Sequence, residues 1–122
     1  GIRRGAVGET REIASRLLAN AIPTIVFAKS RIQVEVLTRY LARELGARSI
    51  RVNTLAPGAI ETDFAGGLVR DNPHINAQLA AHTALGRVGL PEDIGAMAAV
   101  LLSDEAGWMT AQRVEASGGM FV

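Results

Sequence analysis

Residues 51–63, RVNTLAPGAIETD, constrain the fold of this chain more than any other stretch. Apolar and β-branched residues lie just before it and in its first half: Ile50, Val52 and Leu55. Residues of this kind favour a strand buried within a sheet. Pro57-Gly58 then ends the strand, because proline donates no ladder hydrogen bond and glycine adopts backbone angles closed to other residues. The stretch therefore predicts a buried strand that runs into a turn and a polar loop.

Two polar residues, Asn53 and Thr54, are expected near the carboxyl end of that strand. Open α/β sheets bind their ligands in the crevice outside the carboxyl ends of the strands. We therefore expect Asn53 and the loop that follows Pro57-Gly58 to line a ligand site.

The first 28 residues permit more than one interpretation. Gly1, Gly5 and Gly8 could form a phosphate-binding loop in front of a helix, or they could belong to a leader or remnant without that role. Residues 9–21 have the apolar stripe of a helix, and residues 24–28 read as a short strand.

A long helix is predicted from residue 29 or 30 to residue 45, with Gly46 as its C-cap. The apolar residues expected to face the sheet are Val34, Leu37, Leu41 and Leu45. Val36 and Tyr40 fall on another side of the same helix. Two apolar faces indicate a second packing partner, and the alternative is a half-exposed Tyr40 on a monomer.

Three more segments complete the pattern. Residues 61–83 are polar and interrupted by glycine and proline, a helix opens at Pro91, and residues 112–116 read as a last strand. The buried stripe expected for the Pro91 helix is Ile94, Met97, Ala98 and Leu101. The sequence thus predicts one α/β domain over residues 1–122, with about three strands and flanking helices.

Composition excludes several classes of protein. A net charge of +1 gives no basic field for nucleic acid, and no apolar run reaches the roughly 18 residues of a membrane span. The N-terminus lacks the apolar core of a signal peptide, and the absence of cysteine suits a reducing compartment, so we expect a cytoplasmic protein. His74 and His82 have no second ligand at metal spacing and are expected to be surface histidines rather than metal ligands.

Three runs of sequence resemble the C-terminal half of the short-chain dehydrogenase/reductases. They are residues 34–63, residues 85–94 (LGRVGLPEDI) and residues 112–120 (QRVEASGGM). The resemblance is continuous from about Val34 to the end of the chain. It implies a truncated, Rossmann-like parallel sheet with flanking helices. It also implies an oxidoreductase that interconverts a carbonyl and an alcohol with NAD or NADP, and the sequence leaves both cofactors open.

The resemblance assigns the nicotinamide end of the cofactor to the loop after the central strand. The residues that it places in contact with NAD(P) are Pro57, Gly58, Ile60 and Thr62, with Asn53 beside them. Backbone groups freed at the end of a strand can bind a carboxamide, and Thr62 can reach a carboxamide or a phosphate. The alternative is a loop retained only as structure. In the family, residues 61–83 correspond to a mobile pair of short helices that closes over substrate.

The family's catalytic pair is a tyrosine acid/base with a lysine four residues later, whose charge favours the phenolate. Those positions fall on Phe27 and Arg31, and Phe27 has no proton to give. Tyr40, the chain's one tyrosine, has no lysine at the required spacing. Either the middle of a dehydrogenase is missing, or residues 24–31 are a degenerate version of the catalytic segment.

These observations leave two classes of function. The first is an NAD(P)-dependent oxidoreductase of this family, impaired or inactive as this chain. The alternative is a non-catalytic oligomerisation or nucleotide-binding module on the same scaffold. The expected partners are a second copy of the chain, through the 31–45 helix and the C-terminal strand, and a small-molecule substrate if the chain is active.

Overall fold

The computed structural model describes Glu12, Arg16 and residues 30–122. Glu12 and Arg16 form an i, i+4 ion pair, and both are helical, which agrees with the helix predicted around them. The glycine segment, the remainder of that helix and the strand predicted for residues 24–28 lie outside the described residues.

The chain divides into two compact units. The first comprises Gly1–Thr54 and Gly107–Arg113. The second comprises Leu55–Ala106 and Val114–Val122.

Helix α2 spans Arg31–Leu45 of the first unit, as predicted. Ser30 caps it, because the serine hydroxyl accepts a hydrogen bond from an amide of the first turn. The helix ends before Gly46, but Gly46 keeps a right-handed φ of −58° and leads into the 3-10 turn η1 (Gly46–Arg48). Ser49 takes the left-handed conformation, with a φ of 58°, so the chain reverses three residues later than expected.

The buried face of α2 makes the core of the first unit. Leu41 and Leu45 are 4% and 3% exposed. The partly buried residues packed against them are Leu37, Ile50 and Val52. Each fully buried side chain of this kind contributes about 1.5–3 kcal/mol. Buried Thr38 lies on the same face; its hydroxyl donates to the Val34 carbonyl at 2.8 Å and therefore accepts from the hydroxyl of Thr54.

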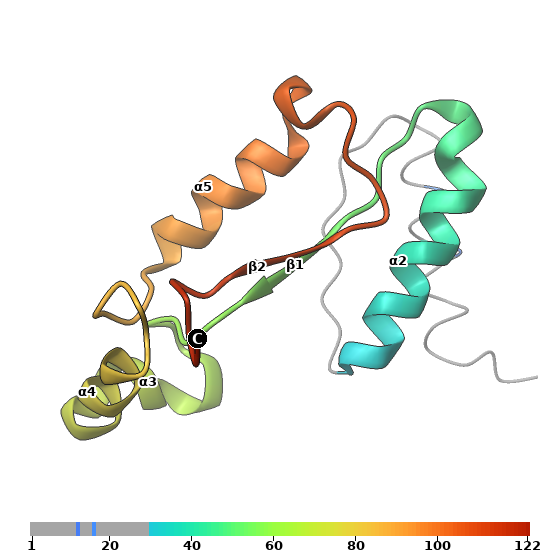
Figure 1. Ribbon diagram of the computed structural model, residues 1–122. Helices are drawn as coiled ribbons and strands as arrows, with labels where there is room; N and C mark the ends of the chain where they lie inside the picture. The colour runs from blue at the N-terminus through green and yellow to red at the C-terminus, as the bar shows by residue number, and fades with distance from the viewer. Residues whose placement is uncertain (1–11, 13–15, 17–29) are drawn as a thin grey trace, which may run out of the picture. The chain divides into compact units, whose positions relative to one another are not determined.

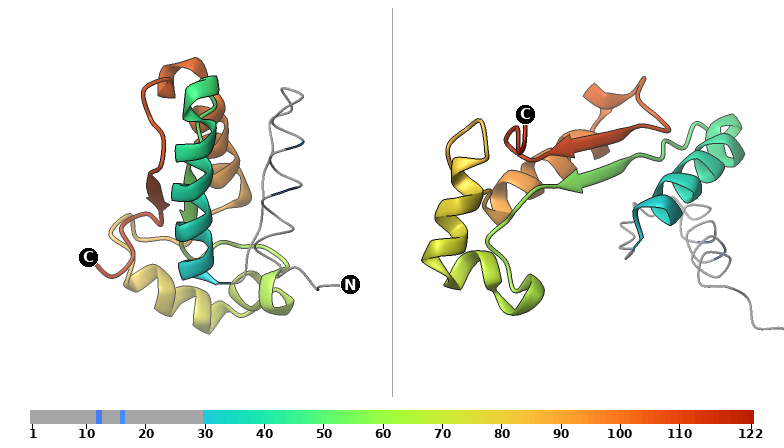
Figure 2. Two further views of the ribbon diagram at one scale, coloured as in Figure 1. Left: turned by 90° about the vertical axis from the view of Figure 1, so that its right-hand side faces the viewer. Right: turned by 60° about the horizontal axis from the view of Figure 1, so that its bottom comes forward.

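Two strands, β1 (Thr54–Pro57) and β2 (Arg113–Ala116), form a parallel sheet and lie side by side in Figures 1 and 2. The Thr54 amide donates to the Gln112 carbonyl at 2.8 Å, and the Gly58 amide donates to the Ala116 carbonyl at 3.1 Å. Both partners advance together along the chain, which is the register of a parallel pair. The described residues are thus an α/β arrangement with parallel strands, as predicted.

The start of β1 differs from the prediction. The strand was expected from about Ile50 but begins at Thr54, and Pro57 ends it as predicted. Asn53 therefore lies in front of the strand and Thr54 is its first residue, so the position expected for both, near the carboxyl end, is wrong.

The second unit contains the predicted pair of short helices. Helix α3 (Leu68–Asp71) and helix α4 (Pro73–Ala81) lie against each other (Figure 1) and follow the 3-10 turn η2 (Phe64–Gly66). Asn72 caps α4, because its side-chain oxygen accepts from the Ile75 amide at 3.1 Å.

Helix α5 (Pro91–Leu102) begins at the predicted proline and leads into the 3-10 turn η3 (Asp104–Ala106). Its four partly buried residues are Ile94, Met97, Ala98 and Leu101, which is the predicted stripe. Within the described residues, no helix is long and apolar enough to cross a membrane.

Candidate functional site

The loop that leaves β1, residues 57–62, is held by backbone hydrogen bonds on two sides. The Gly58 amide donates to the Ala116 carbonyl at 3.1 Å, at the end of β2. Gly89 donates to the Ala59 carbonyl at 2.9 Å and accepts from the Glu61 amide at 3.0 Å. These contacts fix the loop's path before any ligand binds.

Two glycines let the backbone segments approach this closely. A Cβ atom on Gly58 would lie 2.7 Å from both Cα and Cβ of Ser117. A Cβ atom on Gly89 would lie 2.4 Å from Cδ1 of Ile60. A larger residue at either position would push the loop away from its neighbours.

The Ile60 amide is a backbone hydrogen-bond donor that the described residues leave without an acceptor. Ile60 and Gly89 form a parallel bridge, which uses the peptide groups of Ala59 and Glu61 and directs those of Ile60 away from Gly89. Among the described residues, none accepts a hydrogen bond from the Ile60 N–H. A backbone donor fixed in this way suits a ligand acceptor, because an unsatisfied donor is otherwise costly.

Thr62 supplies a second polar group close by in the chain. Its amide donates to the Ile60 carbonyl at 3.0 Å, and its hydroxyl oxygen accepts from the Phe64 amide at 3.2 Å. The hydroxyl hydrogen has no acceptor among the described residues and can therefore donate to a ligand. Ile60 and Thr62 together suit a carboxamide or phosphate oxygen, and Pro57 stands exposed at the strand end.

Asn53, the fifth predicted contact, belongs to the first unit. Its side-chain nitrogen donates to the Met109 carbonyl at 2.9 Å, and its side-chain oxygen accepts from the Gln112 amide at 3.1 Å. Both ends of the carboxamide are therefore engaged with the segment that precedes β2. The structure groups Pro57, Gly58, Ile60 and Thr62 in one loop and gives Asn53 a structural contact elsewhere.

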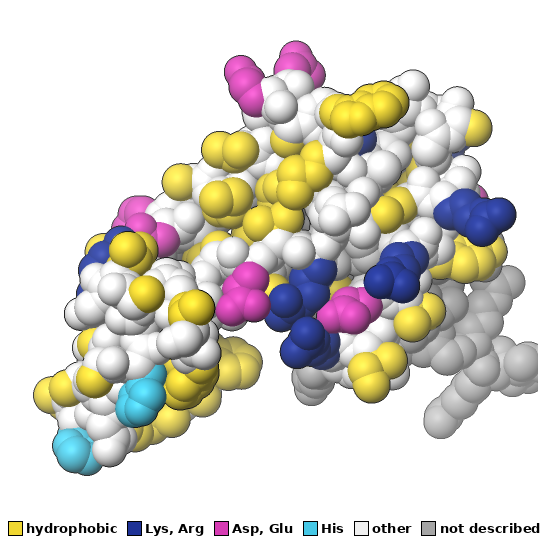
Figure 3. Space-filling model, in the orientation of Figure 1, with side chains coloured by type: hydrophobic (Ala, Val, Ile, Leu, Met, Phe, Trp, Pro, Cys, Tyr) yellow, Lys and Arg dark blue, Asp and Glu magenta, His cyan; other side chains and the backbone are white. Residues whose placement is uncertain are grey.

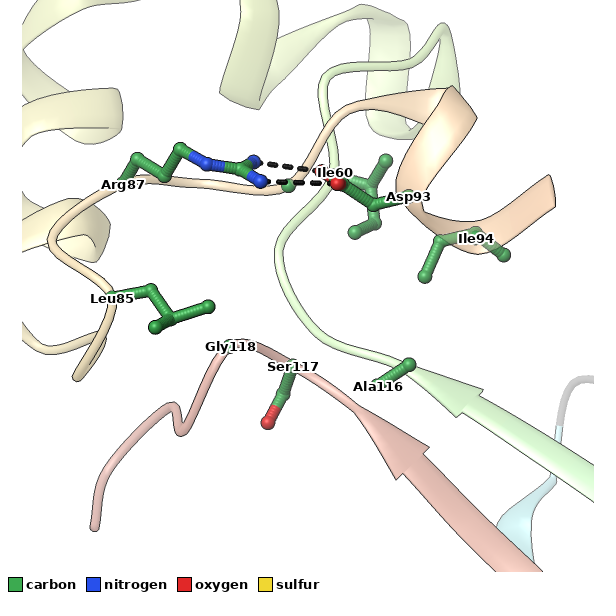
Figure 4. A pocket seen from close by; sticks show the side chains of 9 residues that line it. Ile60, Leu85, Arg87, Asp93, Ile94, Ala116, Ser117 and Gly118 are labelled. Carbon is green, nitrogen blue, oxygen red and sulfur yellow. Dashed lines mark hydrogen bonds and ion pairs between the residues drawn. The ribbon is translucent and has the colours of Figure 1, made fainter. Parts of the chain in front are cut away.

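A small cavity of about 130 Å³ lies in the second unit (Figure 4). Its apolar wall includes Ile60, Leu85, Ile94 and Ala116. Typical pockets for ligands of drug size measure about 300–1,000 Å³, so this cavity is too small for a dinucleotide. Sequence reasoning did not find it, because its walls come from four segments that only the fold brings together.

Arg87 and Asp93 form an ion pair at the wall of that cavity (Figure 4). The two guanidinium nitrogens lie 2.7 and 3.0 Å from the carboxylate oxygens. The same carboxylate accepts from the Leu90 amide at 2.8 Å and caps α5. Arg87 and then this amide lower the pKa of Asp93 to about 2. Asp93 is therefore charged throughout the physiological range and holds the Arg87 turn to the helix start.

Of the two positions that the resemblance assigns to the catalytic pair, the structure describes one, Arg31. Phe27 lies outside the described residues. Arg31 is in the first turn of α2, where its Nε donates to Oε1 of Glu35 at 3.1 Å with most of its side chain exposed. Tyr40 lies in the same helix and is half exposed.

The two histidines lie at the surface around α4 (cyan in Figure 3), as predicted. His74 is in that helix, and His82 follows it with its ring 5.4 Å from that of Phe121. Within the described residues, no three potential ligands gather to hold a metal ion.

Comparisons with known proteins all match this chain to reductases and dehydrogenases. A family model described as enoyl-(acyl carrier protein) reductase matches residues 8–121. The 3-oxoacyl-(acyl-carrier-protein) reductase of Chlamydia pneumoniae is 40% identical over 94 residues, which cover 77% of this chain and 37% of the relative. A short-chain type dehydrogenase/reductase of Picea abies is 37% identical over 119 residues, covering 95% of this chain and 42% of the relative.

A solved structure shows the same similarity. The 3-oxoacyl-(acyl-carrier protein) reductase of Brucella melitensis with bound NAD has 36% sequence identity and a TM-score of 0.61. The match covers 73% of this chain and 30% of that one. This chain thus spans less than half the length of these three relatives.

Proposed function

Because the chain belongs to the short-chain dehydrogenase/reductase family, we propose that its loop 57–62 binds the nicotinamide end of NAD or NADP. The observation that carries the proposal is the Ile60 N–H, a backbone donor without an acceptor among the described residues. A related reductase whose structure contains NAD supports this choice of cofactor.

Each loop residue has a distinct task in this proposal. Ile60 donates its N–H to the carboxamide oxygen, and the Thr62 hydroxyl donates to the carboxamide or to a phosphate. Pro57 presses on the ring, and Gly58 keeps the loop against β2. When bound, the nucleotide carries the hydride that interconverts a carbonyl and an alcohol.

The chain by itself does not complete that reaction. Carbonyl reduction needs a proton donor beside the hydride carrier, and Phe27 has none. Arg31 is engaged with Glu35 on the surface of α2 and does not replace an acid/base. When the purified chain is mixed with NADPH and a panel of ketones, the absorbance of NADPH should therefore fall only at the background rate. Sustained oxidation of NADPH would contradict this part of the proposal.

The test of binding is a titration of the 122-residue chain with NADH and NADPH, followed by nucleotide fluorescence. Wild type and Thr62→Ser keep the hydroxyl and should give saturable curves. Thr62→Val has nearly the same shape without the hydroxyl, and loss of about 1 kcal/mol of hydrogen bonding should weaken binding about fivefold. Equal affinities for the serine and valine variants would remove Thr62 from the site.

A second function, assembly with another copy of the chain, is favoured by the exposed side of α2. Ile32, Val36 and Tyr40 follow one another at helical spacing and are 75%, 59% and 50% exposed. We propose that this stripe, with the C-terminal strand, forms a homo-oligomer contact. The same helix also carries exposed or partly exposed charged side chains of both signs, among them Glu35, Arg39 and Arg43, as expected for the polar rim of an interface.

Light scattering tests this assembly at high protein concentration. Wild type should exceed the monomer mass, and Val36→Glu should return the chain to a monomer. Ala47→Glu, an exposed position beyond the helix, is the matched control and should keep the wild-type mass. A wild-type monomer would exclude the contact.

A further inference from the structure

One side chain joins the loop of the candidate site to both short helices. The Nδ2 atom of Asn76, in α4, donates to Oε1 of Glu61 at 2.8 Å and to the carbonyl of Val69, in α3, at 3.0 Å. Asn76 and Glu61 are both half-buried.

We propose that Asn76 is a positioning residue that fixes Thr62 through Glu61; the inference rests on the proposed nucleotide site. Glu61 immediately precedes Thr62 in the chain. Its amide is held by the Gly89 carbonyl at 3.0 Å, and its carboxylate is held by Asn76. With both the backbone and the side chain of Glu61 fixed, the peptide that carries Thr62 has little freedom to rotate.

The chemistry of this junction requires a carboxamide. An NH2 group has two hydrogens, and here one serves a carboxylate and the other a carbonyl. An aspartate at position 76 would offer no donor and would place a second negative charge beside Glu61. In the described part of the chain, no other side chain reaches the Glu61 carboxylate.

The neighbouring ion pairs hold the segment less firmly. Arg70 lies between Asp63 and Asp71, with nitrogen–oxygen distances of 2.5 and 2.7 Å, but its side chain is about half exposed and both carboxylates are more than half exposed. Exposed pairs of this kind contribute little because water and salt screen them. Asn76 is the partly buried contact of the segment and carries more of the coupling.

Coupling of this kind acts in both directions. If Asn76 holds Thr62 in place for the nucleotide, a bound nucleotide must in turn stabilise α3 and α4.

The first experiment measures amide hydrogen exchange by NMR on the 122-residue chain without nucleotide. In Asn76→Ala, the amides of Glu61 and Thr62 should exchange about fivefold faster than in wild type, the change expected for one lost hydrogen bond. Gln78→Ala, an exposed position of the same helix, is the matched control and should leave both rates unchanged. Equal rates in the two variants would overturn the proposal.

Substitutions at Glu61 separate a specific contact from general loosening. Glu61→Gln keeps an oxygen that can accept from Asn76 and should retain slow exchange at Thr62. Glu61→Ala should reproduce the effect of Asn76→Ala, and the double variant should be no faster than either single one. Additive increases in the double variant would show that the two residues act independently.

Addition of NADPH or NADH to the same samples distinguishes the two proposals. Slower exchange at Thr62 in wild type, with a loss of that slowing in Asn76→Ala, supports both. If wild type shows no response to nucleotide while Asn76→Ala still speeds exchange, the proposed function fails and the positioning role stands. If nucleotide protects wild type and Asn76→Ala equally, the function stands and the positioning role fails.

Discussion

Gly58 illustrates how one position can decide whether the candidate loop closes onto the last strand. A methyl group there would lie 2.7 Å from the Ser117 backbone, and a backbone atom cannot move aside as the end of a side chain can. Gly95, in the middle of α5, has open space around the same methyl group. Gly58 is thus required for the close approach of the loop to Ser117, whereas packing around Gly95 does not require a glycine.

Gly58→Ala is expected to destabilise the chain by about 1–3 kcal/mol, the usual cost of overpacking, and to weaken nucleotide binding. Gly95→Ala, as the matched control, should stabilise it by about 0.5–1 kcal/mol because alanine favours a helix interior. Urea denaturation of both variants measures the difference. A neutral Gly58→Ala variant would show that the loop does not depend on its close approach to Ser117.

The lowered pKa of Asp93 predicts how the stability of the chain depends on pH. Its pKa is lowered to about 2 in the folded chain, so its contribution to stability is present above its usual pKa near 4. That contribution is lost as the pH falls from about 4 toward 2. Asp93→Asn should therefore lower Tm at pH 7 and flatten the fall of Tm between pH 5 and pH 2, as measured by circular dichroism.

Glu92→Gln is the control for that measurement, because it removes an exposed carboxylate from the same turn of α5 without touching Arg87. If Asp93→Asn and wild type lose stability in parallel on acidification, the ion pair does not contribute to folding.

At the level of elements, α2 depends on one buried face. Leu41→Ala should destabilise the chain by about 2–4 kcal/mol, because it opens a cavity beside Leu45 that the helix cannot fill. Gln33→Ala, at an exposed position of the same helix outside the proposed oligomer stripe, should cost less than about 0.5 kcal/mol. Denaturant unfolding compares them, and similar losses for both would mean that the helix is not anchored by this cluster.

Elements with local signals could be predicted from the sequence. The cap at Ser30 and the proline at Pro91 begin α2 and α5 where expected, because each signal acts within one helical turn. The start of β1 could not be predicted in this way. It depends on pairing with β2 and on the engagement of Asn53 by a segment more than fifty residues later in the chain.

In the candidate site, too, features with a local sequence signal could be predicted, and contacts between distant residues could not. The 57–62 loop could be found from its motif and from the proline that ends the strand. The contact between Asn76 and Glu61, and the pair of Arg87 and Asp93, could not, because the sequence gives no sign of which polar side chains meet across a turn. The role of Asn53 as a cofactor contact stays a prediction.

At the scale of the whole molecule, the chain carries the signature of the short-chain dehydrogenase/reductase family over most of its length. It matches a family model over residues 8–121 and spans less than half the length of the relatives described above. We propose that these residues include the nicotinamide end of a nucleotide site.

Saturation-transfer NMR of NAD+ and NADP+ with the purified chain tests that claim most directly. Protons of a bound ligand receive saturation in proportion to their closeness to the protein. We predict that the nicotinamide ring protons receive more saturation than the adenine protons, because loop 57–62 contacts that end of the cofactor. Absence of transfer at millimolar nucleotide, or transfer confined to the adenine protons, would contradict the account.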